Sequence, residues 1–251
     1  MQYARSRPGS YSYSSGIPPG VKWLLISNVA LFLANFFTVA LTGRDPFRIL
    51  ALAPWQVLEY GYLWQLGTYL FLHGGLMHIL FNMFTLWMFG TELERDWGTG
   101  AFLRYYFLCG VGAGLCVIAA HLALGDLHTR TLGSSGAIYG LLMAYGLLYP
   151  DRTVLFSFLF PIKAKYFVLI IGAIAFLGSF GAAGSGVSHV AHLGGMLFGL
   201  LYLKTGLRRR RPARPGLLAA LRARYRDWKI RRARRKFEVY LRRRDHDRWV
   251  H

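Results

Sequence analysis

The chain has 251 residues, of which 54% are hydrophobic, and it carries 30 Lys and Arg residues against 11 Asp and Glu residues. Its mean hydropathy is +0.32, and this value combined with a net charge of +19 excludes an ordinary soluble globule. The charges cluster at the chain ends, whereas apolar stretches of about 20 residues, long enough to cross a membrane, fill the middle. This segregation predicts a polytopic membrane protein. Cys109 and Cys116 indicate no disulfide, because seven residues of helix would place them about 10 Å apart.

Six apolar segments follow a polar N-terminal region. Residues 1–20 are rich in Ser, Tyr, Gly and Pro and are predicted to form a flexible tail. Membrane-spanning helices are predicted at residues 23–41, 64–89, 101–124, 135–149, 166–180 and 187–203. The connection over residues 43–63 is long and holds aromatic residues suited to the lipid headgroup zone. The predicted fold is an all-α bundle of six transmembrane helices over residues 21–205.

The distribution of basic residues predicts the orientation of this bundle. An even number of spans places both termini on one side, and positively charged connections stay inside. With the termini inside, the inner segments before the C-terminal tail carry Arg5, Arg7, Lys22, Arg95, Arg104, Arg152, Lys163 and Lys165. The outer connections would then carry only Arg44, Arg48 and Arg130. We therefore expect a cell-membrane protein with both termini cytoplasmic and with the start of the fourth span toward the outer leaflet.

Polar side chains inside the predicted spans are functional candidates, because burying them in lipid is costly. They are His73, His78 and Asn82 in the second span, Ser135 and Tyr139 in the fourth, and His189 and His192 in the sixth. Interhelical hydrogen bonding is the structural alternative, and it is the interpretation we favour for His73. No Asp, Glu or Cys joins the histidines in a ligand-like cluster, so neither a metal nor a cofactor is predicted.

The segment Gly133-Ser-Ser-Gly136 begins the fourth span. Taken alone, small residues at the start of a membrane helix favour close helix packing over catalysis. A serine is also a poor nucleophile until a base removes its proton. Together with His78, Asn82 and one histidine of the sixth span, however, Ser135 completes the set that acyl transfer needs: a nucleophile, a base and oxyanion donors.

Three motifs, in order on the second, fourth and sixth predicted spans, resemble those of rhomboid intramembrane serine proteases. They are His73-Gly-Gly-Leu-Met-His78-Ile-Leu-Phe-Asn82, Gly133-Ser-Ser-Gly136 and Ala191-His-Leu-Gly-Gly195. The similarity covers approximately residues 20–205. It implies a Ser–His dyad, with Ser135 as the nucleophile and His192 as the general base.

The resemblance also implies an oxyanion hole formed by the Ser135 backbone N–H and the side chains of His78 and Asn82. A serine in the first turn of a helix suits this role, since the N–H groups there are unsatisfied and the helix dipole is positive. Tyr139 is expected to pack on the His192 ring. Supporting glycines, most of which would let the fourth and sixth spans approach closely, are Gly133, Gly136, Gly140, Gly195 and Gly199.

His189 and His192 lie on one helical face, and spacing alone does not choose between them as the base. Gly195 and Gly199 follow His192 by three and seven residues and place it on the close-packing stripe, which favours His192. The family often has a Trp-Arg pair where this chain has Trp64-Gln65. Loss of that charge predicts a more weakly anchored connection after the first span. Glu94 is expected to be structural.

The resemblance implies an endopeptidase that cleaves single-span transmembrane proteins near the outer membrane face. A catalytically silent relative that binds membrane clients is an alternative, which the presence of both Ser135 and His192 disfavours. A transporter would carry repeated halves or paired broken helices, and the sequence has neither feature.

The C-terminal tail, residues 206–251, is strongly basic. With Lys204 it holds 19 of the 30 Lys and Arg residues of the chain. Leu217, Leu221, Tyr225 and Trp228 recur at helical spacing among arginines, which predicts a basic amphipathic helix. We expect the tail to bind anionic lipids, with nucleic acid as the less favoured partner.

Overall fold

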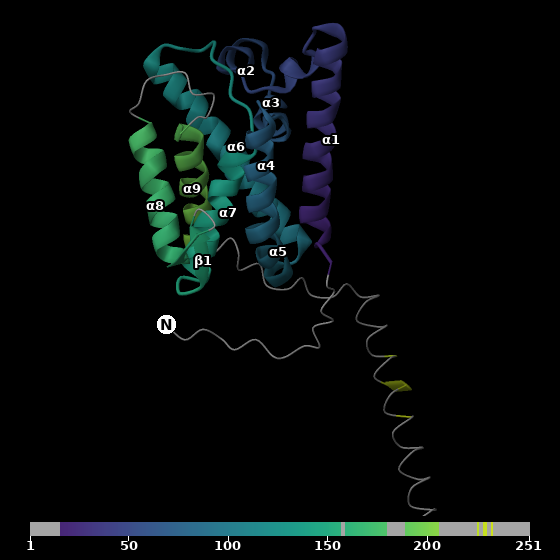
Figure 1. The fold of residues 1–251 in the computed structure, drawn as a ribbon, viewed down its shortest axis with the longest axis vertical. Helices are drawn as coiled ribbons and strands as arrows, with labels where there is room; N and C mark the ends of the chain where they lie inside the picture. Colours follow the sequence, from purple (N-terminus) through teal and green to yellow (C-terminus); the bar gives the residue numbers. More distant parts are fainter. Residues whose placement is uncertain are drawn as a thin grey trace, which may run out of the picture. The chain divides into compact units, whose positions relative to one another are not determined.

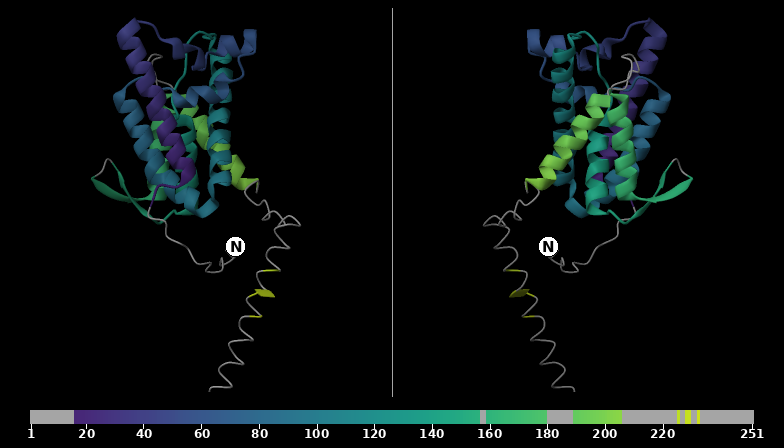
Figure 2. Two further views of the ribbon diagram at one scale, coloured as in Figure 1. Left: turned by 90° about the vertical axis from the view of Figure 1, so that its right-hand side faces the viewer. Right: turned by 90° about the vertical axis from the view of Figure 1, so that its left-hand side faces the viewer.

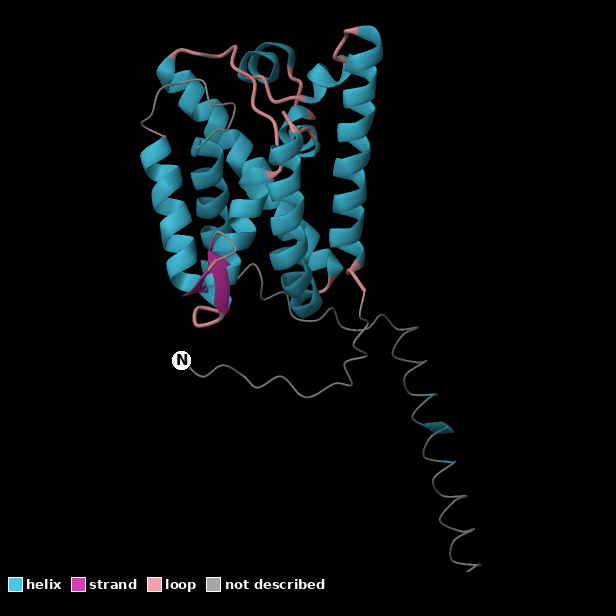
Figure 3. Ribbon diagram, in the orientation of Figure 1, coloured by secondary structure: helices cyan, strands magenta, loops and turns pink. Residues whose placement is uncertain are grey.

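The computed structural model describes residues 16–156, 159–179 and 189–205, together with residues 225, 228, 229 and 232 of the C-terminal segment. The chain divides into two compact units, residues 1–208 and 209–251. The first unit is a bundle of helices with a small two-stranded hairpin at one end (Figures 1 and 3). Of the predicted N-terminal tail, residues 1–15 lie outside the described residues, and the first helix already begins at Pro19.

Long apolar helices form most of the first unit. They are α1 (Pro19–Thr42), α6 (Thr99–Leu124), α7 (Ser135–Leu148), α8 (Ala164–Gly178) and α9 (His189–Lys204). Helices α1 and α6, of 24 and 26 residues, are each long and apolar enough to cross a membrane. Large apolar side chains on α1 face outward, Phe36 and Phe37 being each 57% exposed. This outward apolar surface, with two spanning helices, identifies an integral membrane protein that crosses the bilayer more than once.

The second apolar segment is not one helix. It consists of α3 (Gln65–Thr68), η2 (Tyr69–Phe71), α4 (Leu76–Thr85), a π-helical turn η3 (Leu86–Gly90) and α5 (Thr91–Trp97). The chain bends by 98° between the first two pieces and the remainder. The prediction of one span over residues 64–89 is therefore wrong in its first part. Gly74 and Gly75 lie at the bend, and hydropathy cannot reveal a change of direction within an apolar run.

The long connection after α1 has its own structure. It contains a 3-10 helix, η1 (Pro46–Leu50), and a short helix, α2 (Pro54–Tyr60), each begun by a proline at the first helical position. These elements lie at the end of the bundle opposite the hairpin (Figure 1). The connection over residues 43–63 is therefore ordered and lies over one end of the bundle. We call it the cover.

Gln65 fixes this cover. Its side chain is completely buried, and its oxygen accepts the backbone N–H of Ala53 at 3.0 Å. Its amide nitrogen donates to the Ile49 carbonyl at 3.0 Å and to the Gln56 side-chain oxygen at 2.9 Å. The expectation that glutamine weakens the anchoring here is wrong, because an amide supplies a donor and an acceptor at once.

A β-hairpin interrupts the otherwise helical bundle. Strands β1 (Thr153–Phe156) and β2 (Phe160–Lys163) pair antiparallel, with Val154 opposite Ile162. The prediction of an all-α fold is wrong at this connection between α7 and α8. The strands are four residues long, too short for a periodic signal to distinguish them from a loop.

Glu94, on α5, binds the N-terminal end of α1 through its side chain. The carboxylate is 2% exposed and accepts the backbone N–H groups of Gly20 at 2.8 Å and Val21 at 2.7 Å. The Thr99 hydroxyl donates to the same carboxylate at 2.6 Å. Helix α1 has no side-chain cap of its own, so a carboxylate from α5 satisfies its free N–H groups and faces its positive dipole end. Glu94 is structural, as expected.

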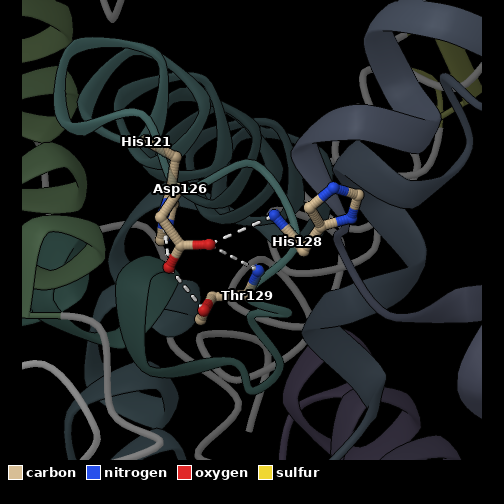
Figure 4. Close-up of polar contacts among 4 residues, drawn as sticks. All are labelled: His121, Asp126, His128 and Thr129. Atoms are coloured by element: carbon tan, nitrogen blue, oxygen red, sulfur yellow. Dashed lines mark hydrogen bonds and ion pairs between the residues drawn. The ribbon is translucent and has the colours of Figure 1, made fainter.

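The connection from α6 to α7 begins with a local turn around Asp126 (Figure 4). One carboxylate oxygen accepts the backbone N–H groups of His128 and Thr129, each at 3.2 Å. The Thr129 hydroxyl donates to the other oxygen at 2.6 Å, and this bond is the main reason that the pKa of Asp126 lies below its usual value. The turn orients the chain that leads into α7.

Candidate active site

The residues before α7 bind to the cover and to the bent second segment. Thr131 and Leu52 exchange two backbone hydrogen bonds, of 2.8 and 2.9 Å. The Gly133 N–H donates to the Tyr69 carbonyl at 2.9 Å, and the φ angle of Gly133 is 115°, in the region that favours glycine. These contacts fix the position of Ser135, the first residue of α7.

Ser135 meets His192 across the bundle. The Ser135 Oγ lies 2.9 Å from the His192 Nε2, and the imidazole is 5% exposed. The Tyr139 ring, one turn after Ser135, stacks on the imidazole with centroids 4.0 Å apart and planes inclined by 5°. The His192 Nδ1 has no hydrogen-bond partner among the described residues. Stacking, rather than a carboxylate, therefore holds this ring.

Glycines allow α7 and α9 to approach closely enough for that contact. A Cβ atom on Gly140 would lie 3.1 Å from the Gly195 carbonyl oxygen, and one on Gly199 would lie 3.3 Å from the Gly140 Cα. A Cβ on Gly136 would lie 3.2 Å from the Ala191 carbonyl oxygen. Larger residues would force the two helices apart, because these neighbours are backbone atoms that cannot rotate away.

His78 and Asn82 lie one turn apart on α4. A Cβ on Gly133 would lie 2.7 Å from the His78 Nε2, so this ring lies against the Gly-Ser-Ser segment. The same Nε2 is buried and has no hydrogen-bond partner in the described part of the chain. Asn82 is 6% exposed. His78 therefore lies beside the start of α7 with an unpaired ring nitrogen, and Asn82 follows it one turn later on the same helix.

His73 has a partner that spacing in the sequence did not predict. Its Nε2 lies 3.3 Å from the Oγ of Ser134, whose side chain is completely buried. The His73 ring also packs edge-to-face on His78, with centroids 5.0 Å apart. His73 lies between two helical pieces, where helical periodicity gives no information about its neighbours.

A sequence profile described as the Rhomboid domain matches residues 60–209, a range that contains every candidate site residue named above. The chain belongs to the rhomboid family. It is 33% identical over 175 residues to Rhomboid protease GluP of Bacillus subtilis, and this match covers 68% of this chain and 32% of that protein. It is 28% identical over 191 residues to Rhomboid protease GlpG of Serratia proteamaculans, covering 76% of this chain and 65% of that protein.

A third relative is Rhomboid-like protease 5 of Toxoplasma gondii, 34% identical over 156 residues. That match covers 59% of this chain and 16% of the relative. The rhomboid chain thus spans between about a sixth and about two thirds of the length of these relatives.

The second histidine of α9 takes a different position in this rhomboid domain. The His189 ring lies edge-on to His192, with centroids 5.9 Å apart. It packs against α8, where a Cβ on Gly178 would lie 2.7 Å from its Nε2. Of the two histidines, His192 is the one that contacts Ser135. Within the described ranges, no group of three or more His, Cys, Asp or Glu side chains has the arrangement of a metal site.

Proposed function

We propose that this rhomboid protein is a serine endopeptidase that cleaves transmembrane substrates within the membrane. The observation that carries the proposal is the 2.9 Å contact between Ser135 Oγ and His192 Nε2. A serine hydroxyl and a base from separate helices at this distance meet the requirement for activating a serine. The printed names of three relatives, each a protease, support the same activity.

In the proposed mechanism, His192 Nε2 accepts the Ser135 hydroxyl proton as Oγ attacks the carbonyl carbon of the scissile bond. The negative charge on the resulting tetrahedral oxygen is stabilised by the Ser135 backbone N–H and by His78 and Asn82. The imidazolium then donates its proton to the leaving amine as the C–N bond breaks. Water attacks the acyl-enzyme in a second round, with His192 again as the base, and releases the acid.

We propose a recessed site in a bundle of six spans, and the length of α7 supports the recessed position of Ser135. Helix α7 has 14 residues, which corresponds to about 21 Å, whereas the hydrocarbon core is about 30 Å thick. If the C-terminus of α7 lies at the cytoplasmic surface, its first residue, Ser135, lies below the outer surface. Both termini are then cytoplasmic, and water reaches the site from outside. Single-span proteins whose helix unwinds near the outer face are the proposed substrates.

A catalytically silent protein that binds membrane clients is the second candidate. Such a protein would need neither the contact between Ser135 and His192 nor the stacking of Tyr139 on that histidine. The intact pair favours the peptidase. Membership of the rhomboid family gives no support to a transporter.

Labelling by a fluorophosphonate tests the proposal, since only an activated serine reacts. We expect the wild-type protein and Ser134→Ala to label, whereas Ser135→Ala does not label and does not cleave a transmembrane substrate. Ser134 is the matched control because it is the neighbouring serine and is not bonded to His192. Labelling of Ser135→Ala, or equal loss in both variants of well-folded protein, would refute the assignment.

We further propose that residues 206–251 form a basic tail that binds anionic lipids on the cytoplasmic face. Most of this segment lies outside the described residues, but Tyr225 and Trp228 are helical and their rings stack with centroids 5.8 Å apart. Arg232 lies over the Trp228 ring at 5.3 Å. An aromatic and basic helical face of this kind suits a charged membrane surface. Salt-sensitive binding of the full chain to phosphatidylglycerol bicelles, lost on deletion of 206–251, tests it against nucleic-acid binding.

A further inference from the structure

Among the described residues, the hairpin between α7 and α8 packs on the core of the bundle near its base. Val154 on β1 is 8% exposed and belongs to the core, and Ile162, opposite it on β2, packs against the same core. Beyond this pair the strands leave the bundle. An isolated two-stranded hairpin is marginally stable in water, so the outer part of this one needs a further contact.

The outer part of the hairpin is apolar where it faces away from the protein. Leu155 is 57% exposed, Leu159 is 73% exposed and Phe160 is 61% exposed. Leu155 pairs with Pro161, so the face opposite to Val154 also carries apolar residues. A hairpin with one face packed and the other in water alternates apolar and polar residues. This hairpin lacks that alternation, which argues against water as its environment.

Basic residues flank the base of the hairpin. They are Arg152, Lys163 and Lys165, accompanied by Asp151, which lies 3.4 Å from the Lys163 Nζ and 3.0 Å from the Lys165 Nζ. Both lysines remain partly exposed, at 53% and 40%. The hairpin thus has an apolar tip and a cationic base. Segments that lie at the boundary between acyl chains and phosphate headgroups have this arrangement.

The hairpin also lies at the depth where lipid is expected. Figure 2 shows its strands leaving the bundle sideways, at a level that the lower turns of the helices also occupy. The chain then enters α8, whose outward residues Tyr166 and Leu169 are 53% and 68% exposed. The exposed apolar residues of the hairpin are therefore followed directly along the chain by the outward-facing apolar side of a membrane helix.

We propose that this hairpin is an interfacial anchor, with Leu155, Leu159 and Phe160 inserted among the lipids of the leaflet that surrounds the start of α8. The free edges of its two strands limit the depth, because unpaired backbone groups are not tolerated in the hydrocarbon core. The strands thus lie at headgroup level, where water and phosphate satisfy these edges. The exposed Lys163 and Lys165 at the base then contact lipid phosphates. The identity of the leaflet as the inner one rests on the proposed topology, and the peptidase activity plays no part in it.

Spin labels on the full chain in proteoliposomes test the anchor. The parent is Cys116→Ala, since Cys109 is completely buried and Gly194 packs against the Cβ of residue 116, which alanine keeps. The test position is Leu159→Cys, and the matched control is Thr153→Cys, exposed at the base of the same hairpin. The vesicles contain phosphatidylcholine and phosphatidylglycerol in a ratio of about three to one. Power saturation then compares collisions with oxygen and with a water-soluble nickel chelate.

We expect the label at residue 159 to collide more often with oxygen than with the chelate, and the label at residue 153 to show the reverse. Equal exposure of both positions to the chelate would overturn the proposal, because the hairpin would then lie in water. A label at residue 159 that is shielded from both reagents would also overturn it, since a protein surface would then cover the hairpin. Circular dichroism of each variant establishes that the bundle is folded, independently of any peptidase assay.

Discussion

Two carboxylates of α5, Glu92 and Glu94, lie two residues apart and should differ sharply in their contribution to stability. The Glu94 carboxylate is 2% exposed and accepts the N–H groups of Gly20 and Val21, at the start of α1. In Glu94→Gln the shape is kept, but one oxygen becomes an NH₂ group that faces an N–H donor. One buried N–H loses its acceptor, which costs about 1–3 kcal/mol. The loss of a negative charge at the helix N-terminus adds roughly 0.3–1 kcal/mol.

The expected destabilisation in Glu94→Gln is therefore about 1–4 kcal/mol. Glu92 is paired with Arg152, but its side chain is 27% exposed and that of Arg152 is 57% exposed. A partly exposed ion pair contributes about 0.2–1 kcal/mol, and a glutamine at position 92 can still accept the Tyr145 hydroxyl, which lies 2.8 Å from the carboxylate. Glu92→Gln is thus the matched control, with an expected loss below about 1 kcal/mol.

Unfolding in mixed micelles, driven by a rising fraction of sodium dodecyl sulfate and followed by circular dichroism, measures both variants against wild type. We expect wild type to be the most stable, Glu92→Gln to be slightly less stable, and Glu94→Gln to be much less stable than both. Equal losses in the two variants would mean that the cap on α1 contributes no more than a surface ion pair. An unchanged Glu94→Gln would show that α1 gains no stability from this contact.

Three further predictions concern the site and its cover. His192→Ala should abolish both cleavage and fluorophosphonate labelling, whereas His189→Ala should keep a measurable fraction of each; the reverse pattern would make His189 the base. Asn82→Ala should lower kcat by about 100-fold with a much smaller change in KM if the amide donates mainly in the transition state, and a change confined to KM would assign it to substrate binding. Gln65→Arg, which restores the residue common in the family, should destabilise the cover by about 1–3 kcal/mol, because arginine cannot accept the Ala53 N–H; an unchanged unfolding midpoint would contradict this reasoning.

Hydropathy located the helices well where an apolar run follows one direction. The predicted helices at residues 101–124 and 135–149 correspond closely to α6 (Thr99–Leu124) and α7 (Ser135–Leu148). It failed at the bend around Gly74 and Gly75, because composition measures how apolar a segment is and not where it points. It also missed the hairpin over residues 153–163, whose strands are too short for a pattern to emerge.

The sequence by itself determined the family and the membrane environment, and it supplied the residues proposed for the site. Motifs carry the identities of Ser135, His192, His78 and Asn82, since each lies in a local pattern that can be recognised without coordinates. Which serine meets which histidine is a different kind of fact. Ser135 and His192 are 57 residues apart in the chain, and no local pattern gives the distance between them.

The tertiary structure decided those distances, because they depend on how closely helices pack. The 2.9 Å contact between Ser135 and His192 exists because glycines remove the side chains that would separate α7 from α9. The same packing brings His73 to Ser134 and gives the buried Gln65 its three partners. A hydrogen bond tolerates an error of only a few tenths of an ångström, and that precision arises from packing across the bundle rather than from the order of residues along it.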